Sequence, residues 1–502
     1  MRVFALAARL AGAMPALALG GCLAGPDYLG PPVGTVPARW EPAPADVTSR
    51  TVPGSVEVDW WKSFHDRELS SLVDRLAAQN LDLKSAAERV IQGVAQRQIA
   101  YSQGLPHVGG QAQDTYNRQS LNGTLSLLTP APGAPATYGL FQDSLNSSWE
   151  LDFFGRIRRA VEAADAATLA AIENRHAVAL ASLAELAQTY MQLRGTQVRL
   201  EIAARNLELA KENVDLVQAR FGNGVATTLD LAQARAQQAT IAATLPPLRT
   251  EEAALINAEG YLLGETPHAL DGELHGSGLM PHIPRRIPIG LPATLIRRRP
   301  DVREAEARLH EATAQTGVAV ANFYPDVTLN GNLNVESLHL ANLFTPNSIA
   351  YTLGPSVSLP IFEGGQLHGN LVLRESEQRE AAIAFQRTVL QAWREVDDAL
   401  TAFSEAQHRR AELAKAVDQN KIALDAARQR YTQGAVDFLN VIAAQTQLLQ
   451  SENDLADSDT QIAVDLVTLY RALGGGWEIA DTAVAIGPPP PPPAGVPPLP
   501  PE

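Results

Sequence analysis

The stretch that decides the fold runs from residue 186 to residue 224 and reads LAQTYMQLRGTQVRLEIAARNLELAKENVDLVQARFGNG. An apolar residue returns at every seventh position, at Leu186, Leu193, Leu200, Leu207, Val214 and Phe221. Such a spacing is typical of the seam of a coiled coil, in which long helices pack side by side. The stretch ends in Phe221-Gly222-Asn223-Gly224, and glycine suits the left-handed cap that closes a helix. The sequence therefore predicts a long helical rod that turns at Asn223-Gly224 and returns.

The same pattern occurs a second time, 210 residues later. The corresponding seam positions are Val396, Phe403, Arg410, Val417, Leu424 and Tyr431, of which five are apolar. The turn is repeated as well, because Gly224 corresponds to Gly434 in Tyr431-Thr432-Gln433-Gly434. Agreement in glycine position, and not only in helical composition, indicates an internal duplication. The chain is therefore predicted to hold two helical hairpins of the same length.

A different periodicity precedes each rod, with apolar and polar residues in strict alternation. Before the second rod the apolar or small residues are Val327, Leu329, Gly331, Leu333 and Val335, and in the partner segment Ile349, Tyr351, Leu353, Pro355, Val357 and Leu359. A period of two is the pattern of a β-strand, so residues 323–361 are predicted to form a hairpin. A weaker version at about 105–152 predicts a hairpin before the first rod.

Two interpretations of these strands are open. Strands of roughly ten residues with one apolar and one polar face are typical of a transmembrane barrel with a wet lumen. A soluble antiparallel sheet with one face on a core has the same alternation. In a membrane, the strands of a single chain would leave unpaired edges in lipid, so the first interpretation requires that several copies assemble.

The N-terminus has the pattern of an export signal. Residues 1–21 carry two arginines, then an apolar stretch over residues 10–19, and end in two glycines directly before Cys22. The sequence Leu-Gly-Gly-Cys resembles a bacterial lipobox, which implies that Cys22 becomes the first mature residue and carries a diacylglyceryl and an N-acyl lipid. Two or more acyl chains hold a protein firmly on a membrane. Leu23 in place of aspartate favours the outer membrane, by analogy with lipoprotein sorting.

Composition and charge exclude several classes of protein. The formal net charge of −15 becomes −17 when the two arginines of residues 1–21 leave, so no nucleic-acid partner held through its phosphates is expected. Cys22 is the only cysteine, which excludes intrachain disulfides and cysteine-ligated zinc. Beyond residue 21 the sequence has no uncharged apolar run of 18 residues, so a bundle of transmembrane helices is not expected.

The sequence has no recognisable catalytic motif of the GxSxG, HExxH or Walker type. His268, His275 and His282 are evenly spaced, but this spacing fits neither successive turns of a helix nor a close pair of loop ligands for a metal. Gly474-Gly475-Gly476 follows the second returning helix, so we interpret it as a helix stop and not as a phosphate-binding loop. The tail from Pro488 to Pro501 is proline-rich and is expected to be extended.

Seven short motifs, in order along nearly the whole chain, carry a resemblance to a known family. They are Cys22 with Gly25-Pro26-Asp27-Tyr28, Trp60-Trp61-Lys62-Ser63-Phe64, Trp149-Glu150-Leu151-Asp152-Phe153-Phe154-Gly155-Arg156, Arg298-Arg299-Pro300-Asp301 with Ala305-Glu306, Phe323-Tyr324-Pro325, Pro360-Ile361-Phe362-Glu363-Gly364-Gly365, and Leu473-Gly474-Gly475-Gly476-Trp477. With the duplicated rods and hairpins, they resemble the outer membrane factor family, the TolC-like, NodT-type lipoproteins of tripartite efflux systems.

The resemblance implies a mainly α-helical, internally duplicated protomer with long coiled-coil helices and four transmembrane β-strands. Three protomers would share one twelve-stranded β-barrel in the outer membrane and continue as an α-helical barrel into the periplasm. It further implies a homotrimer that works with a periplasmic adaptor and an inner-membrane pump and contacts outer-membrane lipid. Cargo would pass through passively, with no enzyme activity and no cofactor besides the lipid on Cys22.

The resemblance also assigns roles to particular residues. Gly155 and Gly364-Gly365 would lie where a strand turns sharply into a helix at the barrel rim, a turn that glycine tolerates. Adaptor docking is implied at the helical tips. The tip residues are Phe221, Gly222, Asn223, Gly224, Tyr431, Thr432, Gln433 and Gly434.

A narrow, charged aperture at the tips is the remaining implied feature. Family members often carry aspartates six and nine residues after the second turn glycine, where this chain has Asn440 and Ala443. Asp437 and Asp230 are the available substitutes, and copies of one carboxylate around an axis would favour cations. The alternative is that both are helix-start residues, which the macrodipole favours.

These observations predict the following organisation. Residues 1–21 form the signal peptide and residues 22–59 a lipid-anchored tether. The first repeat covers residues 60–264, with a helix, the hairpin at about 105–152 and the helical hairpin at about 155–263. A linker and equatorial segment covers 265–300. The second repeat covers 301–476, with a helix, the hairpin at about 323–361 and the helical hairpin at about 364–473, and residues 477–502 form a C-terminal segment.

The leading functional hypothesis is a passive outer-membrane duct for small toxic molecules or drugs in a tripartite efflux assembly. A duct for type I protein secretion is the nearest alternative. A different class of function is a periplasmic scaffold lipoprotein that conducts nothing, and such a scaffold has no need for strands with a wet face.

Overall fold

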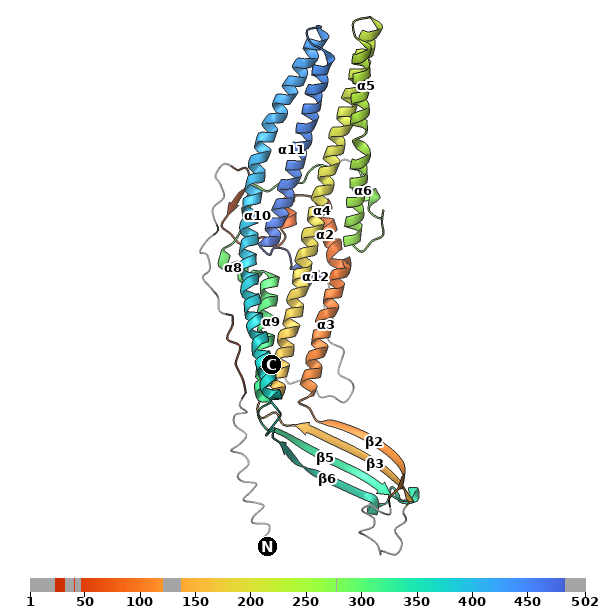
Figure 1. Cartoon of the computed structure of the whole chain (residues 1–502), viewed down its shortest axis with the longest axis vertical. Coiled ribbons are helices and arrows are strands. Elements are labelled where there is room, and N and C mark those ends of the chain that lie inside the picture. Colours follow the sequence, from red (N-terminus) through yellow and green to blue (C-terminus); the bar gives the residue numbers. More distant parts are fainter. Residues whose placement is uncertain (1–22, 32–39, 41–46, 121–136, 277, 484–502) are drawn as a thin grey trace. The chain divides into compact units, whose positions relative to one another are not determined.

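The computed structural model describes residues 23–31, 40, 47–120, 137–276 and 278–483 (Figure 1). The chain groups into two compact units, each assembled from three stretches of sequence. The first unit comprises residues 1–31, 92–169 and 306–383, and the second comprises residues 32–91, 170–305 and 384–502. Cys22 and the proline-rich tail lie outside the described residues.

The elements of the first half are β1 (Arg50–Val52), the 3-10 helix η2 (Trp60–Phe64), α2 (Arg67–Gln79), α3 (Leu81–Ser102), β2 (His107–Arg118), β3 (Thr137–Glu150), α4 (Arg156–Gly222), α5 (Thr228–Ala242), α6 (Leu245–Leu262) and α7 (Asp271–Leu274). Those of the second half are β4 (Arg286–Pro288), α8 (Pro292–Arg298), α9 (Pro300–Ala321), β5 (Asp326–Ser337), η4 (Leu340–Asn342), η5 (Pro346–Ser348), β6 (Ile349–Ser358), α10 (Gln366–Thr432), α11 (Phe438–Ala472) and α12 (Ile479–Ala483). β1 and β4 form a short parallel pair.

Four sets of corresponding elements in the two halves have equal lengths, whereas β3 has 14 residues and β6 has 10. α3 and α9 each have 22 residues, β2 and β5 each have 12, and α4 and α10 each have 67. From the start of α5 to the end of α6 the chain covers residues 228–262, which matches the 35 residues of α11. The predicted duplication is therefore visible as a repeated set of element lengths. Within the described ranges, no helix is both long and apolar enough to cross a lipid bilayer.

The first returning helix is broken where the second is continuous. α5 ends at Ala242, and α6 begins at Leu245 with prolines 246 and 247 in its first turn. Proline has no N–H to donate and its ring clashes with the preceding turn, so it is tolerated only where a helix begins. α11 has no proline and runs without interruption from Phe438 to Ala472.

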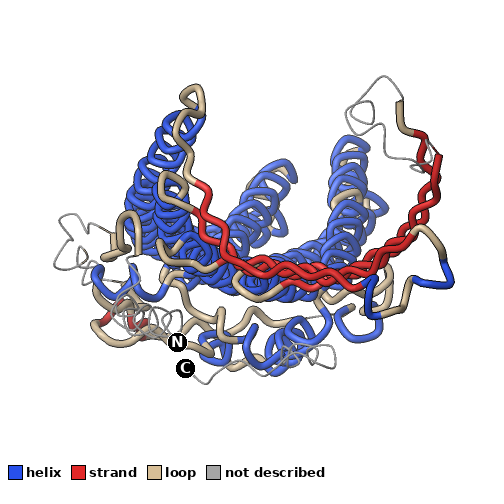
Figure 2. Tube along the Cα trace, turned by 90° about the horizontal axis from the view of Figure 1, so that it is seen from below, coloured by secondary structure: helices blue, strands red, loops and turns tan. Residues whose placement is uncertain are grey.

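The first unit contains one antiparallel sheet in the strand order β2-β3-β5-β6. Figure 2 shows these strands side by side as one curved ribbon. The register places Leu145 opposite Leu333, and Leu333 opposite Tyr351. The next row joins Asn146 to Asn332, whose side chains are hydrogen-bonded at 2.6 Å, and then Thr352.

Because side chains alternate across a strand, this register sorts them by polarity. One face carries Leu145, Leu329, Leu333, Val335, Ile349, Tyr351 and Leu353, together with Asp114 and Asp143. The other face collects Asn146, Ser148, Asn330, Asn332, Asn334, Thr352 and Ser356. Tyr351 and Leu353 are mostly exposed, so none of the described residues covers the apolar face there.

The core of the second unit is built around the aromatic residues of η2. The indole of Trp60 stacks on Tyr470 of α11 with ring centroids 5.0 Å apart, and its Nε1 donates to the carbonyl of Gly475 at 3.0 Å. Gly476 has φ 100°, and a Cβ there would lie 2.5 Å from the Leu183 side chain. The glycines after α11 therefore end the helix and also allow the chain to pass close to Trp60.

The coiled-coil seam differs between the two halves. In α10, Val396, Phe403, Val417, Leu424 and Tyr431 are buried as predicted, and the exposed Arg410 pairs with Asp459 at 2.5 Å. In α4, only Leu186 and Leu193 are fully buried among the predicted seam residues. The prediction for the lower part of this seam was wrong. From residue 202 to the end of α4 the buried residues are Ile202, Ala203, Asn206, Ala210, Asn213 and Val217.

This shifted seam is partly polar. The Asn206 amide donates to Glu452 at 3.1 Å, and the Asn213 amide donates to Gln445 at 2.7 Å. Arg428 donates to the Asn213 carbonyl oxygen at 3.0 Å. Small side chains let α4 approach α11 closely, and a straight helix drifts relative to a seven-residue repeat, so the buried face moves away from the leucines.

Candidate functional site

Both helical hairpins turn through a glycine in the left-handed conformation. Gly224 has φ 72° and Gly434 has φ 73°, a region that a residue with a Cβ rarely adopts. In the first turn the N–H of Val225 donates to the carbonyl of Arg220 at 2.9 Å, and the second turn repeats this bond 210 positions later at the same distance. The turns themselves thus satisfy carbonyl groups at the helix ends.

The two tips pack against each other within one chain. The Arg220 guanidinium lies over the ring of Tyr431, 4.8 Å from its centroid, and donates to the carbonyl of Thr432 at 3.0 Å. Phe438 lies beside Tyr431, with ring centroids 5.2 Å apart. Burial raises the pKa of Tyr431, with Asp230 adding to the rise and Arg220 opposing it. The buried residues beneath are Val217, Leu231, Ala234, Val417, Leu424, Val441 and Leu448.

The predicted docking residues lie at these tips, and seven of the eight are exposed. They are Phe221, Gly222, Asn223, Gly224, Thr432, Gln433 and Gly434. Tyr431 is the exception, since only 5% of it is exposed. Its ring supports the contact between the tips and is not part of the accessible surface.

The predicted aperture residues have different local roles. Asp230 belongs to a capping box at the start of α5: its carboxylate accepts from the backbone N–H and the hydroxyl of Thr227, both at 2.8 Å. Asp437 occupies the N-cap position of α11, and its carboxylate makes no capping hydrogen bond there. Asn440 is exposed and donates to the carbonyl of Asp437 at 3.3 Å. The helix-start interpretation therefore holds for Asp230, and Asp437 is the acid with an uncommitted carboxylate at the cap.

The junction between β3 and α4 lies in the first unit and holds the start of the described chain. Gly155 has φ 82°, and a Cβ there would lie 2.5 Å from the side chain of Leu23. The N–H of Ala24 donates to the carbonyl of Phe154 at 3.0 Å. The second junction uses Gly364 and Gly365, with φ 57° and 89°. Both turns from strand to helix thus use left-handed glycine.

Arg159 fixes the segment that follows Cys22. Its side chain is 1% exposed, and its guanidinium donates to the carbonyl of Ala24 at 3.1 Å and to the Asp27 carboxylate at 2.5 Å. Glu162 accepts from the same guanidinium at 2.7 Å. The ring of Tyr28 then stacks on His310 with centroids 4.3 Å apart. The Gly-Pro-Asp-Tyr motif is therefore a docked segment, although it was predicted to be part of an extended tether.

Exposed aromatic residues gather at the same junctions. Phe154 stacks on Tyr324, with centroids 4.7 Å apart. Phe153, Phe323 and Phe362 are exposed. Aromatic residues in such a position are typical of the boundary between hydrocarbon and head groups in membrane proteins.

The described residues hold no group of three or more side chains that could ligate a metal. The three evenly spaced histidines have separate surroundings: His268 lies 3.0 Å from Asp271, His275 lies 3.4 Å from Glu252, and the His282 ring is near His65. They do not converge on one point.

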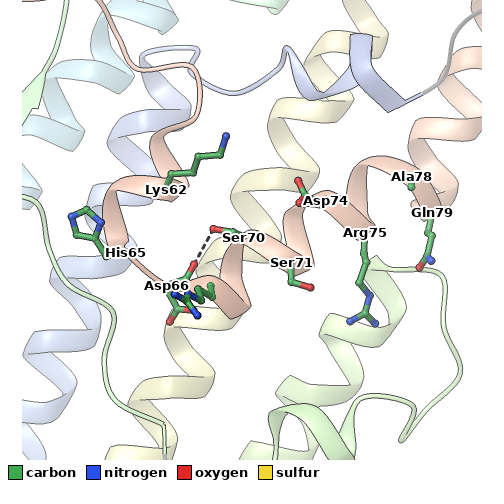
Figure 3. Close-up of a pocket in the computed structure, with 10 residues that line it drawn as sticks. Lys62, His65, Asp66, Ser70, Ser71, Asp74, Arg75, Ala78 and Gln79 are labelled. Atoms are coloured by element: carbon green, nitrogen blue, oxygen red, sulfur yellow. Dashed lines mark hydrogen bonds between the residues drawn. The ribbon is translucent and has the colours of Figure 1, made fainter.

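A surface depression of about 720 Å³ lies along α2 (Figure 3). Two of its charged residues, Asp66 and Arg75, make structural contacts. Asp66 caps α2 through the N–H of Leu69 at 3.0 Å and accepts from the Tyr190 hydroxyl at 2.9 Å. Arg75 forms ion pairs with Glu265 and Glu273, each at 2.9 Å. Both residues therefore have a structural role at this depression.

Sequence reasoning missed Arg159 and the contacts of Arg220. Arg220 could have been noticed, because its counterpart Arg430 keeps the offset of 210 residues. Nothing in the pattern distinguishes Arg159 from its neighbours Arg156 and Arg158, since its burial depends on a segment more than 130 residues away.

Comparisons with known proteins agree with this architecture. The family described as outer membrane efflux protein matches residues 72–256 and 291–475. The Nodulation protein T of Rhizobium leguminosarum bv. viciae is 32% identical over 93% of this chain and 94% of its own length. The cation efflux system protein CusC of Escherichia coli O6:H1 is 28% identical over 92% of this chain and 97% of its own.

Among solved structures, the outer-membrane channel OprN is 32% identical, with a TM-score of 0.83 over 91% of this chain and 100% of that one. Both halves of the chain, with their hairpins and helical rods, are included in these matches. Among these relatives, CusC is named as a cation efflux system protein and OprN as an outer-membrane channel. This chain belongs to the outer membrane efflux protein family.

Proposed function

We propose that this protein is the outer-membrane channel of a tripartite efflux system and passively conducts small toxic molecules or drugs. The observation that carries the proposal is the sheet of the first unit. Its register gathers most apolar side chains on one face and asparagine, serine and threonine on the other. Among the described residues, Tyr351 and Leu353 of the apolar face are mostly exposed. A lipid bilayer outside and water inside would satisfy both faces.

The edges of this sheet support assembly with other copies. Among the described strands, β2 and β6 each pair on one side only. An unpaired edge in hydrocarbon leaves several backbone groups without partners, which costs several kcal/mol per group. We infer that β6 of one copy pairs with β2 of the next, and that three copies close a twelve-stranded barrel as the family resemblance implies. The helical rods would then line a continuous duct.

We infer that Cys22 carries the lipid. Leu23 packs at Gly155, in the turn between strand and helix, and exposed aromatic residues surround the same turn. An acyl group on the preceding residue would therefore begin at the depth where the sheet leaves the membrane. The lipid and the barrel would enter the outer membrane at the same level.

The tips are the proposed site for the periplasmic adaptor that links the channel to its inner-membrane pump. The exposed turn residues around Gly224 and Gly434 support this assignment, because backbone groups and small side chains there are accessible. For the aperture we propose Asp437, whose carboxylate makes no capping hydrogen bond, in preference to Asp230 and Asn440. Three copies of Asp437 around one axis would favour cations over anions.

The experiment is an accumulation assay in a strain that lacks the gene. Cells would carry wild-type protein, no protein, or a variant lacking residues 327–359, which removes one hairpin but leaves Cys22. Accumulation of a fluorescent dye and susceptibility to drugs should rise without the protein, return to normal with the wild type, and stay high with the variant. Immunoblotting of the outer membrane serves as the control for protein level.

The alternatives predict other outcomes. If the deletion variant restores efflux as well as the wild type does, conduction through the sheet is wrong and a scaffold role takes its place. If dye and drug responses never change but a secreted protein is lost from the medium, the duct serves protein secretion. A change confined to toxic metal ions would assign a cargo like that in the name of the relative CusC.

A further inference from the structure

The duplication places an arginine, an aromatic ring and a backbone carbonyl on each tip, but the contact between the two tips uses only one set of these groups. Arg220 of the first tip reaches the ring of Tyr431 and the carbonyl of Thr432 on the second tip. We propose that Arg430 makes the same contact on a neighbouring copy of the chain, with its guanidinium over the ring of Phe221 and a hydrogen bond to the carbonyl of Gly222. This inference rests on the proposed assembly of several copies and adds a specific contact between them.

The repeat supplies every group that such a contact needs. The 210-residue offset that relates α4 to α10 pairs Arg220 with Arg430. It also pairs the ring of Tyr431 with that of Phe221, and the carbonyl of Thr432 with that of Gly222. The backbones of the two turns are equivalent, with φ 72° and 73° at the glycines and closing hydrogen bonds of 2.9 Å in both. A donor and an acceptor site are thus present in the same local geometry.

Within one chain, these second groups are exposed. Tyr431 is 5% exposed beneath Arg220, whereas the equivalent Phe221 is 39% exposed. Among the described residues, Arg430 is exposed and makes no side-chain hydrogen bond or ion pair, while Arg220 has both of its contacts. A guanidinium over an aromatic face is favourable and more so when water is excluded.

A second copy of this chain fits the exposed groups better than another partner. Each tip hairpin has two flanks, and the flank that joins the hairpins inside the chain is already packed around Arg220. Arg430 of the second tip and Phe221 and Gly222 of the first tip are exposed. Copies placed side by side in head-to-tail order would therefore repeat the internal contact. Such a head-to-tail contact closes into a ring when the rotation between copies permits.

Cysteine pairs test this contact directly. Cys22 is the only cysteine of the chain, so new thiols would be selective once Cys22 carries lipid. The test pair is Arg430→Cys with Gly222→Cys, and the matched control pair is Arg220→Cys with Thr432→Cys. An added Cβ at Gly222 meets nothing within 4 Å, so this substitution is compatible with the turn. A bis-maleimide that spans the length of an arginine side chain would join the thiols in purified full-length protein, with no adaptor present.

The control pair should crosslink within one chain and leave the mass on a denaturing gel unchanged. The test pair should give covalent dimers and trimers, and each single cysteine variant should give neither. The inference is overturned if the test pair crosslinks within one chain, or if the protein is trimeric in native mass spectrometry but the test pair forms no product. A protein that stays monomeric would overturn the proposed assembly as well, so the two failures are distinguishable.

A second measurement does not depend on reactive thiols. Arg430→Ala and Phe221→Ala should each lower the temperature at which the detergent-solubilised trimer dissociates, by a few degrees. Because both residues serve one contact, the double variant should dissociate at about the temperature of the weaker single variant. Fully additive shifts would contradict the contact. Arg430→Lys should behave like Arg430→Ala to a large extent, because a lysine lacks the planar group that stacks on a ring and reaches a carbonyl.

Discussion

Glu259 lies on α6 in the core of the second unit, fully buried, and neither of its carboxylate oxygens has a hydrogen-bond partner among the described residues. The position 210 residues later is Leu469, which is equally buried on α11. Burial, and the nearby Glu185, raise the pKa of Glu259 well above its ordinary value of 4.5. Burial therefore favours the neutral form of Glu259, at a position where the second repeat has a leucine.

Replacing Glu259 by leucine should stabilise the protein, because an unsatisfied buried polar group costs on the order of 1–3 kcal/mol. The pKa of Glu259 is higher in the folded than in the unfolded state. Its contribution to the free energy of unfolding is therefore complete below about pH 4.5 and is lost as the pH rises through the folded-state pKa. The advantage of Glu259→Leu over the wild type should therefore grow between pH 5 and pH 8. Thermal unfolding followed by circular dichroism measures this difference. The stability of Glu259→Gln should also depend less on pH than that of the wild type, because glutamine does not titrate. Equal pH profiles for all three proteins would contradict the assignment.

Arg159 is the residue on which the docking of the N-terminal segment depends. Arg159→Met should release residues 24–27, because the carbonyl of Ala24 and the carboxylate of Asp27 lose their charged donor. Hydrogen bonds to charged groups contribute about 1.5–3 kcal/mol, so amide exchange in this segment should accelerate roughly 10- to 100-fold. Hydrogen exchange with mass spectrometry measures the change. The half-exposed neighbour Arg158 provides the control, and equal acceleration in Arg158→Met would argue against a specific role for Arg159.

Among the contacts between elements, the polar seam between α4 and α11 is expected to be sensitive to substitution, because its polar groups are buried. Asn213→Leu would leave the Gln445 side chain and Arg428 without their partner in a buried position. We expect a loss of about 1–3 kcal/mol in the free energy of unfolding, measured by denaturant titration. Adding Gln445→Leu should recover part of the loss, since two apolar partners leave fewer unsatisfied groups. A double variant less stable than the single would show that the seam depends on packing and not on hydrogen bonding.

The elements were predictable to the extent that their patterns are local. The alternation in residues 327–335 and 349–359 predicted strands that the structure pairs in one hairpin, and the heptads of α10 predicted its buried face. The heptads of α4 misled below Leu193, because alanine and asparagine are weak signals of burial when large residues stand nearby. Which of two candidate faces is buried depends on the partner helix, and the sequence of α4 alone does not contain that information.

Contacts between distant segments were the least predictable. The Gly-Pro-Asp-Tyr motif was noticed only as a resemblance, and its docking on Arg159 and His310 was not expected. The role of Asp230 in a capping box, by contrast, follows from Thr227 three residues earlier and could be predicted locally. The contact of Arg220 with the second tip requires knowledge of how the hairpins pair.

At the scale of the whole molecule, the proposed lipid and the proposed barrel make separate contributions to membrane association. Cys22→Ala should remove the acyl groups, detected as a change of mass, yet leave the assembled protein in the outer-membrane fraction. The expectation follows from area, because the apolar faces of a barrel bury far more surface than a few acyl chains, at about 25 cal/mol per Å². If the variant disappears from the outer membrane although it is still produced, the lipid is needed for assembly itself.

The equal lengths of α4 and α10 have a consequence for how such a chain can change over time. Deleting one residue from either helix shortens it by about 1.5 Å and rotates everything beyond by about 100°. A deletion in one repeat alone would therefore lift Arg220 or Tyr431 out of reach of the other, and only a compensating deletion in the second repeat would restore the match. The two helices must therefore keep the same length. Among related chains, an insertion or deletion in one of them should be accompanied by a matching change in the other.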